Sequence, residues 1–180
     1  MKCRHPKAGE HRFFFLMSII DVFDRVIITY HHGLSCEARD LVQITQEALM
    51  KRQLFDKANK PVIRSDNGPQ FISHKFAQAC ERFEIVHERI PPKTPNKNAH
   101  IESFHAILEI ECYQRHEFES YKQAYEIVSG FIHNYNHNRI HGSIYDMSPY
   151  EYMDAVGKSR GAKDNKGVKL QNKSQFGEIL

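Results

Sequence analysis

The chain has few cysteines and no long hydrophobic run. Its 180 residues include four cysteines, which stand far apart and form no CxxC pair, so neither a zinc ribbon nor a disulfide framework is indicated. The longest uncharged apolar stretch, residues 13–20, is too short to cross a bilayer, and no cleavage site of a secretory signal accompanies it. These absences predict a soluble protein with no membrane partner in a reducing cytoplasm.

Net positive charge is also absent outside one segment of the sequence. The formal net charge is +3, but residues 157–180 alone carry a net of +4, which leaves −1 for residues 1–156. Bulk charge therefore gives no evidence of nucleic-acid binding. The basic segment contains several glycines and has little periodic hydrophobicity, so we expect residues 157–180 to form a basic, disordered tail.

Apolar residues are abundant enough, at 41% of all positions, to form the core of one domain. Residues 13–20 and 26–30 are rich in aromatic and branched side chains and flank a polar turn at residues 21–25, which is typical of an antiparallel hairpin. Beyond the hairpin, Ser35 can cap a helix whose apolar positions recur at helical spacing and which ends before Pro61.

A crossover unit is expected next. Residues 61–66 have the composition of a short strand, residues 73–83 that of a helix, and residues 85–90 alternate as a half-buried strand does. This order places two parallel strands in one sheet. Residues 91–97 contain three prolines, which belong in neither a sheet nor a helix interior, so they predict an exposed loop.

Two further helices are predicted at residues 99–115 and from Ser120 to about Tyr135. Residues 1–12 show no strand pattern and are expected to be an irregular start. The whole predicts one α/β domain over residues 13–156, a mixed sheet flanked by helices. Four tyrosines at packing intervals are expected in its core rather than as platforms for nucleic-acid bases: Tyr113, Tyr121, Tyr125 and Tyr135.

Two carboxylates stand at positions where ligand-binding groups are expected. Asp66 ends a predicted strand, and Glu102 lies in the first turns of the helix that follows the proline-rich loop. From a strand end and a helix, two such acids can converge on one divalent cation as hard oxygen ligands. Each also has a simpler explanation, because an acid before Asn67-Gly68 often caps the turn and a glutamate is favoured near a helix N-terminus.

Several motifs surround these acids. The sequence reads SDNGPQF at residues 65–71 and NAHIESFH at residues 98–105, with 35 residues between the two acids, and continues with YNHNRIHGS at residues 135–143 and SPYEY at residues 148–152. This combination resembles the DDE transposases and retroviral-type integrases, in particular the transposases of bacterial insertion sequences. The resemblance covers most of residues 13–155.

The resemblance implies an RNase H-like catalytic core for DNA integration and transposition. In that chemistry, three carboxylates hold two Mg²⁺ or Mn²⁺ ions that promote the cleavage and joining of DNA strands. The second acid of the family pattern maps to Asp66 and the third to Glu102. The resemblance also implies DNA as a partner, with Lys93, Lys97 and Arg139 as candidate contacts to it or, for Arg139, to an acid. Self-association in the bacterial cytoplasm or nucleoid is expected by analogy.

The first acid of the family pattern has no match upstream of the hairpin, where residues 1–12 contain no Asp and Glu10 is the only acid. Asp21 is an alternative metal ligand, but it also fits a structural turn in which Asp24 and Arg25 pair. The sequence therefore suggests a partial core whose first strand is missing, which would expose the edge of residues 13–20 to mispairing. We expect a truncated form with impaired activity. The alternative is a catalytically silent remnant that only binds DNA or intact transposase.

A third hypothesis is a histidine-rich metal hydrolase. His133, His137 and His141 recur every four residues and could bind zinc if one helix contained all three. The asparagines around them and Gly142 indicate instead that the helix ends there. Glu109, seven residues after Glu102, is interpreted as a solvated acid rather than a ligand.

Overall fold

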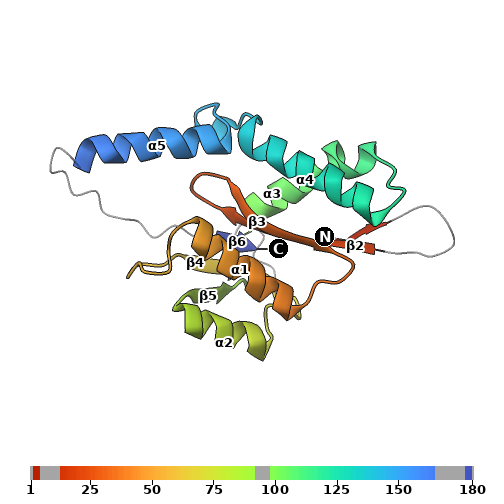
Figure 1. Ribbon diagram of the computed structural model, residues 1–180, viewed down its shortest axis with the longest axis horizontal. Coiled ribbons are helices and arrows are strands. Elements are labelled where there is room, and N and C mark those ends of the chain that lie inside the picture. Colours follow the sequence, from red (N-terminus) through yellow and green to blue (C-terminus); the bar gives the residue numbers. More distant parts are fainter. Residues whose placement is uncertain (1, 5–12, 92–97, 165–176, 180) are drawn as a thin grey trace.

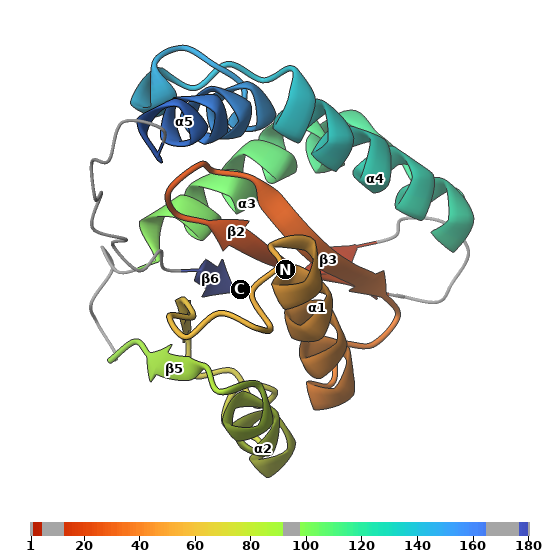
Figure 2. The ribbon, with the colours of Figure 1, turned by 60° about the vertical axis from the view of Figure 1, so that its left-hand side comes forward.

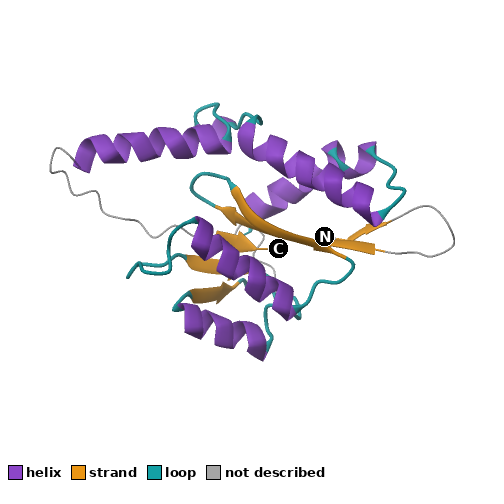
Figure 3. Cartoon of the chain, viewed as in Figure 1, coloured by secondary structure: helices purple, strands orange, loops and turns teal. Residues whose placement is uncertain are grey.

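The protein folds as a mixed six-stranded sheet with helices on both faces (Figures 1 and 3). The computed structural model describes residues 2–4, 13–91, 98–164 and 177–179. Helices α1 (Ala38–Lys51) and α2 (His74–Phe83) cover one face of the sheet, and α3 (Ala99–Glu111) and α4 (Tyr121–His137) cover the other (Figure 2). This arrangement confirms the predicted α/β class.

The hairpin at the start of the domain is formed as predicted. Strand β2 (Phe13–Asp21) pairs in antiparallel fashion with β3 (Ile27–Gly33). In the turn, the Asp21 amide donates to the Val26 carbonyl at 2.9 Å, and Arg25 adopts a left-handed conformation with φ of 66°. Strong β-type composition on both sides of a short polar turn is a local signal, which is why the sequence predicts it well.

The chain before the hairpin differs from the prediction. Residues Lys2–Arg4 form strand β1, which pairs with Phe13, Phe14 and Phe15 of β2. The prediction of an irregular start is therefore wrong for residues 2–4, while residues 5–12 lie outside the described residues. A three-residue strand is held by main-chain hydrogen bonds to its neighbour and needs no alternating pattern of its own.

The predicted crossover unit is confirmed. Strand β4 (Val62–Ser65) and strand β5 (Val86–Arg89) pair in parallel, with Val62 opposite Val86, and α2 connects them. Ser73 caps α2 by accepting a hydrogen bond from the amide of Phe76 at 3.2 Å.

The end of the chain also departs from the prediction. Helix α5 (Pro149–Asp164) continues beyond the predicted boundary at residue 156, and Gly177–Ile179 form strand β6. The prediction of a disordered tail is thus wrong for residues 157–164 and 177–179, and residues 165–176 lie outside the described residues. Strand β6 has neighbours on both sides, and main-chain pairing of that kind orders a segment of low hydrophobicity.

The helix starts follow local capping rules, with one difference. Helix α4 begins after Ser120, whose hydroxyl accepts a hydrogen bond from Gln123, as predicted. Helix α1 begins after Glu37 rather than Ser35, because Glu37 and Asp40 form a capping box. Helix α3 ends at Glu111 and is followed by the 3-10 turn η2 (Tyr113–Arg115), whereas a second 3-10 turn, η3 (Gly142–Ile144), follows α4.

Two hydrophobic clusters fill the space on either side of the sheet. One lies between β2, β4, α1 and α2 and is centred on Leu41 and Phe76; the other lies between β2, β3, α3 and α4 and includes Ile20 and Phe104. Of the four tyrosines expected in the core, Tyr135 is buried, but Tyr121 and Tyr125 are 39% and 45% exposed. Their prediction as core residues is wrong: Tyr121 packs its ring on Phe14 and donates its hydroxyl proton to the His32 carbonyl at 2.6 Å.

Candidate active site

Asp66 directly follows β4 and is half-buried. Its Oδ1 accepts a hydrogen bond from the Gly68 amide at 2.8 Å, so the carboxylate does cap the turn. Asn67 donates from its side-chain amide to the Ile90 carbonyl at 2.8 Å, which fixes this turn to the end of β5. A Cβ at Gly68 would lie 2.8 Å from the side-chain nitrogen Nε2 of Gln70 and 3.1 Å from Asp66 Oδ1, so a larger residue would require the Gln70 side chain to move. The turn therefore holds Asp66 in a defined position.

Glu102 lies in the first turn of α3, and its side chain is exposed. The neighbouring Ile101 and Phe104 are buried in the cluster beneath the helix and fix the face that Glu102 presents to solvent. Helix α3 lies against β2 and β6, and β6 in turn pairs with β4, the strand that leads to Asp66. The two predicted acids thus come from two elements that both contact β6.

Two carboxylates are hard oxygen donors and suit a divalent cation such as Mg²⁺. Over the parts of the chain that the structure describes, however, no group of three or more His, Cys, Asp or Glu side chains could hold a metal ion. Among the described residues, the donor set therefore fits a site of one or two protein ligands and not the three-carboxylate centre that the resemblance implies.

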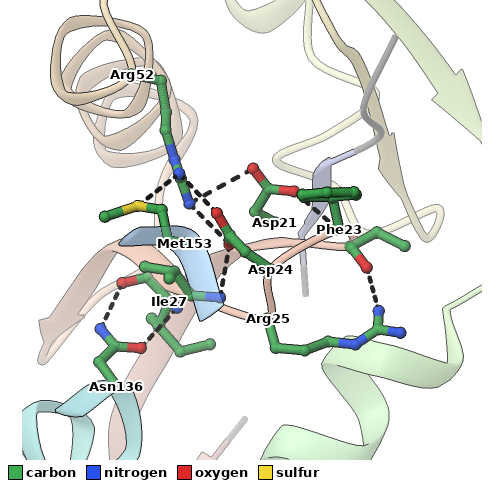
Figure 4. Close-up of polar contacts among 10 residues, drawn as sticks. Asp21, Phe23, Asp24, Arg25, Ile27, Arg52, Asn136 and Met153 are labelled. Carbon is green, nitrogen blue, oxygen red and sulfur yellow. Dashed lines mark hydrogen bonds and ion pairs between the residues drawn. The ribbon is translucent and has the colours of Figure 1, made fainter. Parts of the chain in front are cut away.

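Asp21, the alternative ligand, is part of a buried ionic cluster in the hairpin turn (Figure 4). Its Oδ1 accepts from the Phe23 amide at 2.9 Å and its Oδ2 lies 3.4 Å from Arg52 Nη2. Both oxygens of Asp21 are therefore engaged in structural contacts. This geometry supports the structural-turn interpretation of Asp21.

Asp24 does not pair with Arg25, as the sequence suggested, but with Arg52 at the end of α1. Arg25 instead donates to the Val22 carbonyl, as Figure 4 shows. Burial, with a further contribution from the charge of Asp21, raises the pKa of Asp24 above its ordinary value even though Arg52 opposes the shift. Arg52 stands 28 residues beyond Asp24, and no local pattern in the sequence links the two.

The motif around residues 135–143 has a structural role in the hairpin. Asn136 is buried; its Oδ1 accepts from the Ile27 amide at 2.9 Å and its Nδ2 donates to the Ile27 carbonyl at 3.0 Å (Figure 4). Arg139 Nη1 lies 2.5 Å from Glu111 Oε2, so Arg139 contacts an acid, one of the two partners expected for it. Sequence reasoning missed this role of Asn136. The available signal was the position of an asparagine on the apolar face of the helix, four residues after Ile132.

The three histidines of the zinc hypothesis are not on one helix. Helix α4 ends at His137, and His141 lies beyond it with its ring 4.9 Å from that of Tyr135. The ring centroids of His133 and His137 lie 4.1 Å apart, with the ring planes tilted by 35°. This arrangement gives no geometric support for zinc.

Two other predicted features have different outcomes. Lys93 and Lys97 lie outside the described residues. Glu109 is half-buried on α3, and its interpretation as a solvated acid stays a prediction.

None of the helices within the described ranges combines the length and hydropathy required to cross a membrane.

Two family models, both described as the integrase core domain, match residues 3–95 and 84–149. The chain belongs to the integrase core domain family. Between them, the two matches include the turn at Asp66, Glu102 and the motif that contains Asn136. The resemblance to transposases and integrases drawn from the sequence is therefore confirmed.

Relatives of this integrase core domain occur in bacterial insertion elements. The chain is 32% identical to an uncharacterized 39.2 kDa protein of insertion element IS476 from Xanthomonas euvesicatoria, over 76% of this chain and 38% of that protein. It is 28% identical to an uncharacterized transposase-like protein from Haemophilus influenzae, over 81% and 65% respectively. A putative transposase InsK for insertion sequence element IS150 of Escherichia coli is 27% identical, over 82% and 51%. The chain thus spans less than two thirds of the length of these relatives.

Solved structures with the same fold are retroviral integrase cores. The catalytic core domain of BIV integrase covers 89% of this chain and 95% of its own length, with a TM-score of 0.57 and 18% identity. A chain of the simian T-cell lymphotropic virus intasome, solved with PP2A regulatory subunit B56 gamma, has a TM-score of 0.66 and 16% identity over 84% and 51%. The HTLV-2 integrase catalytic core domain in complex with magnesium has a TM-score of 0.56 and 12% identity over 84% and 91%. The predicted RNase H-like fold is thereby confirmed.

Proposed function

We propose that this integrase core domain acts on DNA in insertion-sequence transposition and that Asp66 and Glu102 are its metal-binding carboxylates. The observation that carries the proposal is the position of the two acids on two elements that both contact one strand, β6: Asp66 follows β4, and Glu102 lies in the first turn of α3. Membership of the family and the transposases among the relatives support it.

Mg²⁺ is the cation we propose, with Mn²⁺ as a substitute, and a solved integrase core of the same fold contains magnesium. When bound, such a cation supplies Lewis-acid activation of the attacking oxygen and stabilises the leaving oxygen of a phosphodiester. The contribution of Asp66 is a carboxylate fixed by the Gly68 amide, and that of Glu102 is an exposed carboxylate on an anchored helix. We propose Lys93 and Lys97 as sequence-independent contacts to DNA phosphates.

We further propose that this chain has little or no strand-transfer activity by itself, because its described residues offer no third carboxylate to join Asp66 and Glu102. Asp21 is committed to the Phe23 amide and to Arg52, so it does not serve as a third ligand. Two carboxylates hold one cation weakly, whereas the two-metal reaction needs more negative charge. DNA binding without cleavage, or association with an intact transposase, is the alternative activity.

We also propose self-association, as in the dimeric and trimeric forms of a solved core, and residence in the bacterial cytoplasm or nucleoid.

Metal titration of the full chain tests this proposal. In calorimetry with Mg²⁺, we expect one weak site that Asp66→Ala and Glu102→Ala each abolish. Glu109→Gln, on the same helix, is the matched control and should leave binding unchanged. Binding that survives Asp66→Ala would contradict the assignment of the ligands.

A strand-cleavage assay with labelled DNA addresses the activity. We expect the full chain to bind the DNA and leave it uncut in the presence of Mg²⁺. Robust turnover that depends on Asp66 would support the transposition role and overturn the proposed impairment. Turnover that is insensitive to Asp66→Ala would overturn both.

A further inference from the structure

Strand β6 occupies the centre of the sheet although it comes from the far end of the described chain (Figure 2). Gly177, Glu178 and Ile179 pair in antiparallel fashion with Asp21, Ile20 and Ile19 of β2, and in parallel with Ile63, Arg64 and Ser65 of β4. Each residue of β6 therefore has a strand neighbour on both sides.

The two halves of the sheet are paired only through β6 among the described strands. One half consists of β1, β2 and β3, and the other consists of β4 and β5. The order of the sheet runs from β2 through β6 to β4. Without β6, the facing edges of β2 and β4 would present unpaired amide and carbonyl groups, which are costly when buried.

Strands β1 and β6 lie one after the other along the same edge of β2. Phe15 pairs with Lys2 on one side and with Gly33 of β3 on the other, and Ile19 pairs with Ile179 on one side and with Thr29 of β3 on the other. Both short strands run antiparallel to β2, so they point in the same direction. Together they form a discontinuous strand next to β2: β1 pairs with residues 13–15, β6 pairs with residues 19–21, and neither pairs with residues 16–18.

This position also relates β6 to the candidate site. Strand β4, which leads to Asp66, pairs with β6, and α3, which carries Glu102, lies against β6. The edge of residues 13–20 that the sequence suggested would be exposed to mispairing is paired at its two ends, residues 13–15 with β1 and residues 19–20 with β6.

We propose that the space between β2 and β4 is a binding site for an extended peptide strand, that residues 177–179 of the same chain occupy it, and that this occupancy holds the elements carrying Asp66 and Glu102 in register. The recognition is of the main chain, as in the addition of a strand to a sheet. Residues 177–179 are accordingly a positioning segment. Only the part that concerns the two carboxylates rests on the proposed function.

Hydrogen exchange of the unmodified full chain is the first test, because it does not depend on any variant. We expect the amides of residues 177–179 to be protected to a degree similar to those of β4. Exchange of this segment at the rate of a free peptide would overturn the proposal. Protection that rises with protein concentration, together with a dimer in light scattering, would overturn the assignment to the same chain in favour of strand exchange between copies.

Proline substitution tests the main-chain role. Glu178→Pro removes an amide hydrogen from a strand that is paired on both sides, and we expect exchange in residues 19–21 and 63–65 to accelerate by about tenfold or more. Glu178→Gln keeps the main chain and should behave as wild type. Equal exchange in all three proteins would overturn the proposal. If Glu178→Pro unfolds altogether while Glu178→Gln does not, the requirement for main-chain pairing at this position is supported.

Addition of a peptide with the sequence of residues 171–180 to the Glu178→Pro chain tests the binding site directly. We expect protection of residues 63–65 to return, and a peptide that contains the same proline should have no effect. Failure of the first peptide at millimolar concentration would overturn the binding-site proposal.

Mg²⁺ titration of the same variants separates this inference from the proposed function. We expect Glu178→Pro to lose Mg²⁺ affinity and Glu178→Gln to retain it. Unchanged affinity in Glu178→Pro would overturn the positioning role. If the wild-type chain binds no Mg²⁺ but shows the expected exchange pattern, the proposed metal ligands fail and the strand-binding site stands.

Discussion

Arg52 forms a two-pronged ion pair with Asp24: Nη1 lies 2.8 Å from Oδ2 and Nη2 lies 2.9 Å from Oδ1. The pair joins the end of α1 to the turn of the hairpin, and Arg52 also reaches Met153 of α5. Asp24 is 3% exposed, so its charge depends on this one guanidinium and on the Val26 amide. The contact therefore connects three segments that are distant in sequence.

Arg52→Ala should destabilise the protein strongly, because it leaves Asp24 buried without its counter-charge. Removal of one partner of a buried pair costs about 3–5 kcal/mol. The free energy of unfolding from urea titration measures this loss. Arg39→Ala, at a side chain 63% exposed, is the control and should change stability by no more than about 0.5 kcal/mol. Similar effects of the two substitutions would contradict a structural role for Arg52.

Asn136→Ala should also destabilise the fold, since it removes both hydrogen bonds to the main chain of Ile27. An unsatisfied buried polar group costs about 1–3 kcal/mol, and here the amide and the carbonyl of Ile27 both lose a partner. Asn134→Ala on the exposed face of the same helix serves as the comparison and should have little effect. Thermal or urea unfolding that gives the same value for both variants would refute the role assigned to Asn136.

Local signals account for the parts of the fold that the sequence predicted. The hairpin follows from two β-rich runs around a polar turn, and the crossover unit follows from the spacing of residues 61–90. The turn at Asp66 was recognisable because Asn67-Gly68 is a turn dipeptide, and the structure places a capping hydrogen bond there. These features depend on residues that are close in sequence.

Features that depend on distant residues could not be read from the sequence. Strands β1 and β6 contain three residues each and are ordered by main-chain pairing, which leaves no trace in side-chain pattern. The partner of Asp24 is 28 residues away, and Asn136 lies 109 residues from Ile27. For the candidate site, the motifs indicated the two acids, but the strand that both of their elements contact became evident only from the fold.

Acid should weaken the fold through two buried histidines. Burial, with a smaller effect of His31, lowers the pKa of His32 to about 4, and burial lowers the pKa of His105 to about 3. In the unfolded chain both titrate near pH 6.5. Below that pH the unfolded state binds more protons than the folded state, so the free energy of unfolding falls as the pH drops towards 4. Between these pKa values, each histidine lowers the free energy of unfolding by about 1.4 kcal/mol for each unit by which the pH falls.

His32→Phe should reduce the slope of the free energy of unfolding against pH. The unfolded state of this variant takes up one proton fewer than that of the wild type. Both ring nitrogens of His32 are buried without a hydrogen-bond partner, so phenylalanine should preserve or increase stability at pH 7. His133→Gln, on the exposed face of α4, is the control. Urea titrations between pH 4 and pH 7 give the slopes, and an unchanged slope in His32→Phe would show that other groups control the acid response.

The salt dependence of DNA binding should distinguish the lysines of the proline-rich segment, residues 91–97, from Arg139. Each phosphate contact contributes about 0.9 to the slope of log K against log salt concentration. If Lys93 and Lys97 contact DNA, the double substitution to Gln should reduce the slope by about 2 and leave stability unchanged. Arg139→Gln should leave the slope unchanged, because its guanidinium binds Glu111, and should lower stability by no more than about 1 kcal/mol. A reduced slope in Arg139→Gln with no change in the lysine variant would place the DNA path at the end of α4 instead.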